Sequence, residues 1–199
     1  SFTWNNHNKF ITITGGTLDA TALSNSRLVL GDGVSFENIT LKFDADDTLY
    51  ANGNKLVINE NVTLTNAITV YGGSYENKSV YGTDVTIKGG TYKNIYGGSN
   101  EATVFGDTNV TVGGTATAED VYGGGSICTI KGSTNLTFEG NASANYIYGG
   151  CEVSGSGVSG GTNVNFKGGT CTGVYGGSKY ATQNSGTKVR MTGGTTEEV

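Results

Sequence analysis

The chain has 199 residues, a formal net charge of −5 at pH 7 and a pI of about 4.8. Its Lys and Arg residues form no cluster, which argues against a nucleic-acid partner, and no stretch approaches the roughly 20 apolar residues of a membrane-spanning helix. It contains 34 glycines and no proline, a composition that suits strands whose backbone groups are all paired, because proline removes a hydrogen-bond donor.

Short apolar–polar–apolar segments recur from one end of the chain to the other. Alternation of this kind predicts a strand with one apolar face. The average spacing of the segments is about 25 residues, and they begin at Ile11, Ile39, Val62, Val85, Val110, Leu136, Val164 and Val189. A second, looser series of strand segments covers 28–30, 56–58, 80–82, 104–106 and 130–132, and fades into 158–160 and 184–186.

A third series consists of tyrosines that each follow an aliphatic residue. Its members are Tyr50, Tyr71, Tyr96, Tyr122, Tyr148 and Tyr175. The steps between them are 21, 25, 26, 26 and 27 residues, and the last five continue into Gly-Gly. Self-similarity at a period of this size predicts a solenoid of stacked repeats.

Three strand segments per repeat predict the fold class: an all-β, right-handed, three-sided parallel β-helix. We expect seven to eight coils of about 25 residues, forming a single domain over residues 1–199. A β-sandwich would not repeat one strand triplet along the chain, and the hexapeptide regularity of a left-handed β-helix is missing. One interior file is expected to contain Ile11, Leu41, Val62, Ile87, Val112, Phe138 and Phe166.

Polar residues and glycines are expected to form the corners of the coils. The residues before the first-strand segments include Asn38, Asn61, Asp84, Asn109, Asn135 and Asn163. Asn and Asp tolerate the left-handed backbone conformation better than other residues with a side chain, so we predict a column of them at one bend. The Gly-Gly pairs after the first strands and after the tyrosines are predicted to supply the other two bends.

With these repeats, the chain resembles the right-handed, pectin-lyase-like parallel β-helix family. More narrowly, Gly89–Gly98 (GGTYKNIYGG) is similar to repeats in large surface-anchored proteins of Gram-positive gut bacteria. The resemblance implies an extracellular or cell-surface-anchored bacterial protein, in a family that contains both polysaccharide lyases and hydrolases and non-catalytic adhesins. Because the chain stops where the next Tyr-Gly-Gly would begin, we expect a segment of a longer repeat protein.

Residues suited to catalysis or to metal binding are sparse. A β-helix lyase or hydrolase needs acids and bases clustered on one face. The one dense acidic run is Asp44, Asp46 and Asp47, which we interpret as a solvated loop, and the single histidine is His7. No catalytic residue, metal site or cofactor is therefore predicted.

The three cysteines leave two alternatives open. Cys128, Cys151 and Cys171 stand at different positions within successive repeats, so they do not form one column. An odd number leaves at least one thiol unpaired. Either all three are buried free thiols, or Cys128 and Cys151 form a disulfide between neighbouring coils.

One outward column is built mainly of threonine. It runs through Thr12, Thr40, Thr63, Thr86, Thr111 and Thr137, and ends in Asn165 and Arg190. Regular threonine ranks are typical of ice-binding β-helices, but Lys42, Lys88 and Glu139 in the neighbouring rank disturb a flat uncharged face. We interpret the threonines as β-formers on a solvent-facing strand.

The tyrosine column is the other outward column. In Ile68-Thr69-Val70-Tyr71 the two aliphatic residues point inward, so Tyr71 should point outward. The six rings are expected to be parallel and partly exposed, as a structural staple or as a binding platform. Two functions compete: a non-catalytic, adhesin-type β-helix that binds a glycan or a host protein such as an immunoglobulin or mucin, and a polysaccharide-active enzyme or its accessory domain.

Overall fold

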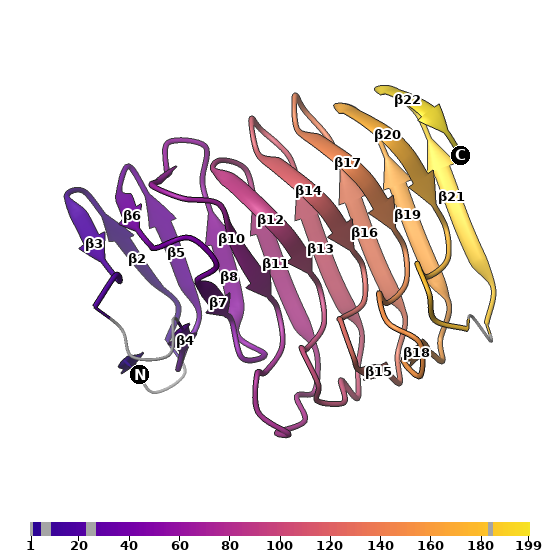
Figure 1. The fold of residues 1–199 in the computed structure, drawn as a ribbon, viewed down its shortest axis with the longest axis horizontal. Coiled ribbons are helices and arrows are strands. Elements are labelled where there is room, and N and C mark those ends of the chain that lie inside the picture. Colours follow the sequence, from indigo (N-terminus) through magenta and orange to yellow (C-terminus); the bar gives the residue numbers. More distant parts are fainter. Residues whose placement is uncertain (1, 5–8, 23–26, 183–184) are drawn as a thin grey trace.

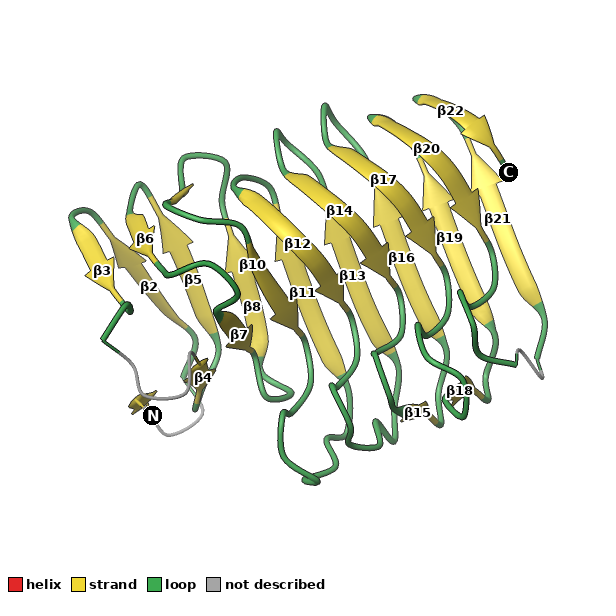
Figure 2. Ribbon diagram, viewed as in Figure 1, coloured by secondary structure: helices red, strands yellow, loops and turns green. Residues whose placement is uncertain are grey.

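The chain folds into a parallel β-solenoid in the computed structural model, which describes residues 2–4, 9–22, 27–182 and 185–199. Strands and loops account for all the described residues (Figure 2), and none of them belongs to a helix long and apolar enough to cross a membrane. Successive coils lie side by side along the long axis, with the amino-terminal coils at one end and the carboxyl-terminal coils at the other (Figure 1). The predicted all-β solenoid is confirmed.

Two long parallel sheets form most of each coil. Sheet A contains β1 (Phe2–Trp4), β4 (Arg27–Leu30), β7 (Thr48–Tyr50), β10 (Ile68–Tyr71), β12 (Thr91–Tyr96), β14 (Thr117–Tyr122), β17 (Ser143–Tyr148), β20 (Thr170–Tyr175) and β22 (Thr195–Glu198). Sheet B contains β2 (Ile11–Thr14), β5 (Val34–Glu37), β8 (Lys55–Ile58), β11 (Thr83–Ile87), β13 (Thr108–Val112), β16 (Thr134–Phe138), β19 (Thr162–Phe166) and β21 (Thr187–Met191). The main hydrophobic core is formed by inward side chains of both sheets and of the segments that join them.

The third side of the coil changes place along the solenoid. In the first coils it lies between a strand of sheet B and the following strand of sheet A, as β3 (Thr17–Asp19), β6 (Thr40–Lys42) and β9 (Thr63–Leu64). In later coils it lies on the opposite connection, from sheet A to sheet B, as β15 (Thr129–Ile130), β18 (Gly157–Val158) and isolated bridges from Val80 to Val104 to Ile130. Figure 1 shows β3 and β6 at the upper edge and β15 and β18 at the lower edge.

This change of side makes part of the predicted interior file wrong. Leu41 pairs with Leu18 and Leu64 in the three-stranded sheet, and Val62 directly precedes β9. Ile11 pairs with Val34 and so belongs to a neighbouring file. The file that contains Ile87, Val112, Phe138 and Phe166 begins instead with Ile13, Phe36 and Ile58. Apolar and polar residues alternate in the same way in sheet A, in sheet B and on the third side, so the alternation alone could not assign a segment to one of them.

The segments 28–30 and 56–58 do not belong to the predicted second strand series. The first is β4 of sheet A and the second is β8 of sheet B. Val80, Val104, Ile130 and Val158 do stack as predicted, and each presents its side chain to a second, smaller hydrophobic cluster. We call this group, together with Cys128 and Cys151, the outer cluster.

Four of the six residues of the predicted Asn and Asp corner column lie inside sheet B. Among the described residues with a side chain, positive φ occurs at Asn38, Asp46 and Asn52, so Asn38 alone of the predicted set adopts it and Asn61, Asp84, Asn109, Asn135 and Asn163 do not. The last four occupy the second position of β11, β13, β16 and β19. The Asn135 side-chain amide donates a 3.1 Å hydrogen bond to Asn109, and Asn163 donates one of 3.1 Å to Asn135. The last four residues therefore form a column that joins strands, and the predicted left-handed bend is confirmed at Asn38 alone.

The two kinds of Gly-Gly pair have different physical roles. After sheet B, Gly90 and Gly169 have φ of 89° and 85°, which favours glycine as predicted. After the tyrosines, Gly97 has no positive φ, but a Cβ placed on it would lie 2.3 Å from the Gly123 carbonyl oxygen of the next coil. The chain does bend at this second pair, as predicted, but glycine is needed there because the coils approach each other closely and not because φ is positive.

Replacing Gly97 by Ala should destabilise the protein strongly. The new methyl group would overlap backbone that cannot move without displacing the next coil, and overpacking of this kind costs about 1–3 kcal/mol or more. Gly177 is the matched control, because its Cβ would meet nothing closer than a side-chain carbon at 4.0 Å. Thermal unfolding should show a clear fall for Gly97→Ala and little change for Gly177→Ala. Equal midpoints for the two variants would contradict the close-approach explanation.

Candidate functional site

The six tyrosines of the sequence repeat form one continuous stack. In sheet A, Tyr50 pairs with Tyr71, and the register continues through Tyr96, Tyr122, Tyr148 and Tyr175. Neighbouring ring centroids are 4.6–5.1 Å apart, and the angles between ring planes are 5–13°. The parallel rings and the place of Tyr50 at the amino-terminal end are confirmed. We call these six residues the tyrosine column.

The expected partial exposure of the tyrosine column is wrong for every member except Tyr175. Tyr50, Tyr71, Tyr96, Tyr122 and Tyr148 keep only 0–8% of their surface accessible, and Tyr175 is half-buried. The rings do face away from the main core, which the preceding aliphatic residues occupy. They are covered because the connections from sheet A to sheet B fold back over them. Alternation predicts the side to which a ring points, but not what lies above it.

The carboxylate of Glu152, from a later coil, covers Tyr96. The Tyr96 hydroxyl donates a 2.6 Å hydrogen bond to Glu152, two coils further on. The Ser126 hydroxyl donates to the same carboxylate oxygen over 3.1 Å. Burial, followed by the hydrogen bond to Glu152, raises the pKa of Tyr96 far above its ordinary value, so the hydroxyl stays neutral and donates.

A partly buried ion pair between Lys179 and Asp120 covers Tyr122. The Lys179 ammonium donates to Asp120 over 3.0 Å and to the Tyr122 hydroxyl over 3.3 Å, and that hydroxyl donates to Asp120 over 2.9 Å. The side chains of Lys179 and Asp120 are 25% and 12% exposed. Burial alone would lower the pKa of Lys179, but the hydrogen bond and the charge of Asp120 outweigh it and raise the pKa. The ammonium also lies 5.7 Å from the centre of the Tyr148 ring, within cation–π range.

These contacts satisfy the hydroxyl groups of Tyr96 and Tyr122 from within the chain. A ligand could reach Tyr96 and Tyr122 only by displacing Glu152 and Lys179, and each ring of the column is already stacked on its neighbours. Of the two roles that the sequence left open, the geometry favours the structural staple. The binding role proposed for Tyr50, Tyr71, Tyr96, Tyr122, Tyr148 and Tyr175 loses the exposure on which it depended.

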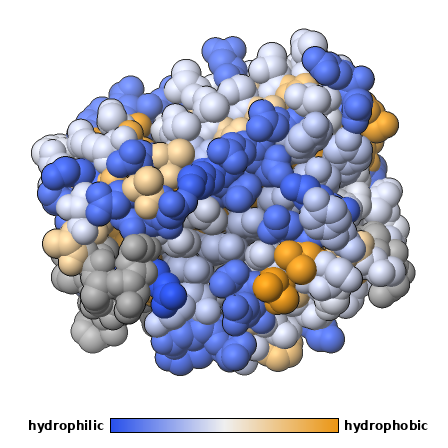
Figure 3. Space-filling view, in the orientation of Figure 1, coloured by the Kyte–Doolittle hydropathy of each residue, from blue (hydrophilic) through white to orange (hydrophobic). Residues whose placement is uncertain are grey.

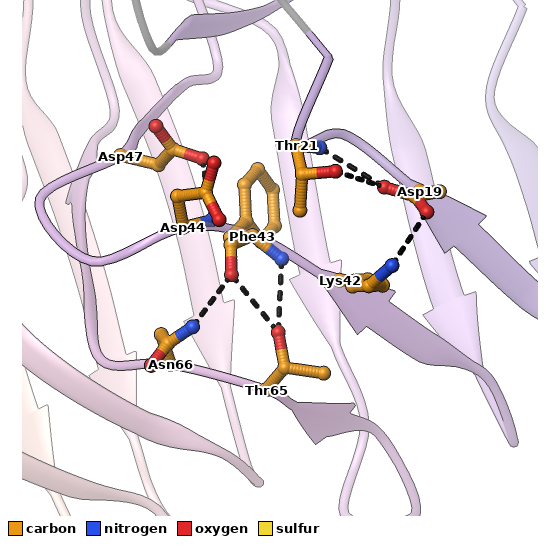
Figure 4. A network of polar contacts seen from close by, with 8 residues as sticks. All are labelled: Asp19, Thr21, Lys42, Phe43, Asp44, Asp47, Thr65 and Asn66. Carbon is orange, nitrogen blue, oxygen red and sulfur yellow. Dashed lines mark hydrogen bonds and ion pairs between the residues drawn. The ribbon is translucent and has the colours of Figure 1, made fainter.

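The acidic run is a locally satisfied turn between β6 and β7 (Figure 4). Its first residue, Asp44, donates its backbone N–H to the Asp47 carboxylate over 2.8 Å, and Asp47 is buried. Asp46 has a positive φ and forms an ion pair with Lys93. The loop assignment is confirmed, but the expectation that all three carboxylates are solvated is wrong for Asp47.

The remaining sequence candidates do not assemble into a site. His7 lies outside the described residues, and within the described part of the chain no three His, Cys, Asp or Glu side chains are grouped to hold a metal ion. The threonine rank is interrupted, because Thr12 aligns with Ser35, while Thr40 and Thr63 belong to the three-stranded sheet. Thr86, Thr111 and Thr137 do align with one another.

Sequence reasoning missed a second set of threonines, which are buried. Thr108 donates its hydroxyl to the Gly123 carbonyl over 2.6 Å, and Thr134 donates to Gly149 over 2.5 Å. Each bond joins the start of a sheet B strand to the glycine that follows a tyrosine. Thr83, Thr108, Thr134 and Thr162 all directly precede the Asp or Asn at the second position of their strand, so the repeat contained the signal.

Exposed large hydrophobic side chains are concentrated on one face. Among the described residues, Phe10, Met191 and Val199 lie in the terminal coils, and the others are Tyr81, Phe105, Ile127 and Tyr180. These four lie on connections from sheet A to sheet B, on the outside of the segments that cover the tyrosine column. In the view of Figure 3, hydrophilic and neutral residues dominate and hydrophobic residues form small separate patches.

Two of the four form an aromatic pair. Tyr81 is 89% exposed and Phe105 is 55% exposed, their ring centroids are 6.2 Å apart, and the ring planes are inclined by 41°. Backbone hydrogen bonds continue the register from Phe105 to Lys131 and on to Ser159, beside a hollow lined by Thr129 and residues 155–159. We call Tyr81, Phe105, Lys131 and Ser159 the outer file.

The sequence held a signal for the outer file. In Val80-Tyr81-Gly82 and Val104-Phe105-Gly106, alternation places the middle residue on the face opposite to a buried valine. Both valines are packed in the outer cluster, as that argument requires.

No protein-family model, no curated protein and no solved structure matches this chain. Its assignment to the parallel β-solenoids therefore depends on its own repeats and strand pairing. The observed architecture supports the resemblance to β-helix proteins at that level.

Alkaline titration should show that the tyrosine column is shielded from solvent in the folded protein. Unfolded tyrosine ionises near pH 10. Burial raises the pKa of Tyr71, Tyr96 and Tyr122 in the folded state, so the stability they contribute is complete below about pH 10 and is lost as the pH rises above it. The tyrosinate absorbance of these residues should rise together with the loss of circular dichroism. If all six tyrosines ionised while the circular dichroism still showed folded β-sheet, the column could not be shielded from solvent.

Proposed function

We propose that this chain is a non-catalytic, adhesin-type β-helix of an extracellular or surface-anchored bacterial protein, and that its outer file binds a glycan chain. The observation that carries the proposal is the exposed pair of Tyr81 and Phe105 at equivalent positions of successive coils. Two large aromatic residues exposed side by side, away from the terminal coils, are typical of an interaction site.

The chemistry of the outer file fits a sugar chain. A pyranose ring presents apolar C–H faces and a rim of hydroxyl groups, so it needs flat apolar contact and nearby hydrogen-bond partners. Tyr81 and Phe105 supply two adjacent faces, while Lys131 and Ser159 continue the file with a cation and a hydroxyl group. Because coils repeat every ~4.8 Å, the file can follow an extended ligand along the solenoid.

The polysaccharide-active enzyme is the second class to be tested. Glycoside hydrolysis ordinarily requires two carboxyl groups that flank the scissile bond. The outer file contains none, and the nearby Asp107 carboxylate accepts a 2.7 Å hydrogen bond from the Ser133 backbone. These observations favour binding without catalysis.

A glycan array should identify the ligand, and paired variants should locate its site. Tyr81→Ala with Phe105→Ala should weaken binding at least tenfold, because both aromatic contacts are removed, while unfolding changes little since both rings are exposed. Tyr180→Ala is the matched control, because Tyr180 is exposed on the same face but outside the outer file.

Three results would contradict the proposal. Unchanged glycan binding by the double variant would exclude the outer file as the site. Capture of a serum or mucus protein with no glycan bound would make the ligand a protein. Release of shortened or unsaturated sugars from a polysaccharide would support the enzyme instead.

A further inference from the structure

Two cysteines meet in the outer cluster. Cys128 is 2% exposed and Cys151 is 0% exposed, and both pack with Val104, Ile130 and Val158. They come from successive coils, on the connections that cover the tyrosine column. In the structure the thiols are free, and the Cys151 sulfur lies 3.6 Å from the Cys128 carbonyl oxygen.

The two sulfur atoms lie against one dipeptide. A Cβ on Gly124 would be 2.6 Å from the Cys151 sulfur, and a Cβ on Gly125 would be 2.3 Å from the Cys128 sulfur. The absence of side chains at Gly124 and Gly125 therefore makes room for both sulfurs at one place.

Other coils have small residues without a thiol at these positions. After the Gly of the tyrosine motif, Ser99 and Ser178 stand where Cys151 stands. Ala102 occupies the position of Cys128 in the preceding coil, as the backbone hydrogen bond from Ile127 to Asn100 sets the register. Thiols thus replace other small residues in the two coils where they can face each other.

We propose that Cys128 and Cys151 are a disulfide site that links two coils beneath the outer face. The oxidant is a small-molecule disulfide. The Cys151 thiolate attacks it, forming a mixed disulfide and releasing one thiolate; the Cys128 sulfur then attacks the Cys151 sulfur and releases the second. Two S–H bonds are lost, one S–S bond is formed, and the oxidant is reduced to two thiols.

The electrostatics of the pair define the order of these steps. The interaction with the Cys151 thiol, followed by burial, raises the pKa of Cys128, whereas the interaction with the Cys128 thiol lowers the pKa of Cys151. Cys151 consequently ionises first and is the attacking thiol. Cys171 packs in the main core instead, in register with Ala144, and serves as an internal control.

The test is refolding of the whole chain in a buffer of oxidised and reduced glutathione, followed by acid trapping, mass measurement and peptide mapping. We expect a loss of about 2 Da, a peptide that joins Cys128 to Cys151, and a single remaining thiol at Cys171. The bond closes a loop of moderate length, so the thermal midpoint should rise by about 5–10 °C over the reduced protein. Cys171→Ser should keep this gain, and Cys128→Ser should lose it.

The proposal is overturned if glutathione adducts replace the intramolecular bond, or if Cys171 is found in the cross-link. A lower thermal midpoint for the oxidised than for the reduced protein would overturn it as well, because a matched site forms the bond without strain.

Discussion

In-register parallel pairing between successive coils is the constraint on which the rest of the structure depends. Each residue lies about 4.8 Å from its equivalent in the next coil, so a residue type that recurs once per repeat becomes a column. Phe138 and Phe166 stack at 5.6 Å in the main core, Asn109 and Asn135 share a hydrogen bond, and the tyrosines form an unbroken stack. The same constraint excludes a Cβ at Gly97, where the backbones of two coils approach too closely.

The tyrosine column lies between the main core and the outer cluster of the solenoid. Sheet A separates it from the main core, and the connections from sheet A to sheet B cover it and enclose the outer cluster. Glu152 and Lys179 fasten this cover to Tyr96 and Tyr122. The surface that is free to bind a partner is consequently one layer further out, where Tyr81 and Phe105 are exposed.

Spacing and alternation were sufficient to predict the solenoid, the stacked rings and the inward direction of residues such as Val70. They could not predict which connection carries the third strand, so Leu41 and Val62 were placed in the wrong file. The burial of Tyr96 could not be predicted from the sequence either, because Glu152 and Ser126, which cover it, come from later coils. The outer file was recognisable as a strand series, but its exposure depends on how the connections fold.

The most direct test of the account is the free energy of unfolding of the double variant Tyr96→Ala, Tyr122→Ala. If the tyrosine column is a buried staple, removing two fully stacked rings should cost at least about 5 kcal/mol, since a single buried aromatic-to-alanine change costs about 3–5 kcal/mol. The exposed Tyr81→Ala serves as the reference and should cost little. A loss below about 1 kcal/mol for the double variant, comparable to an ordinary surface substitution, would contradict the structural role of the column.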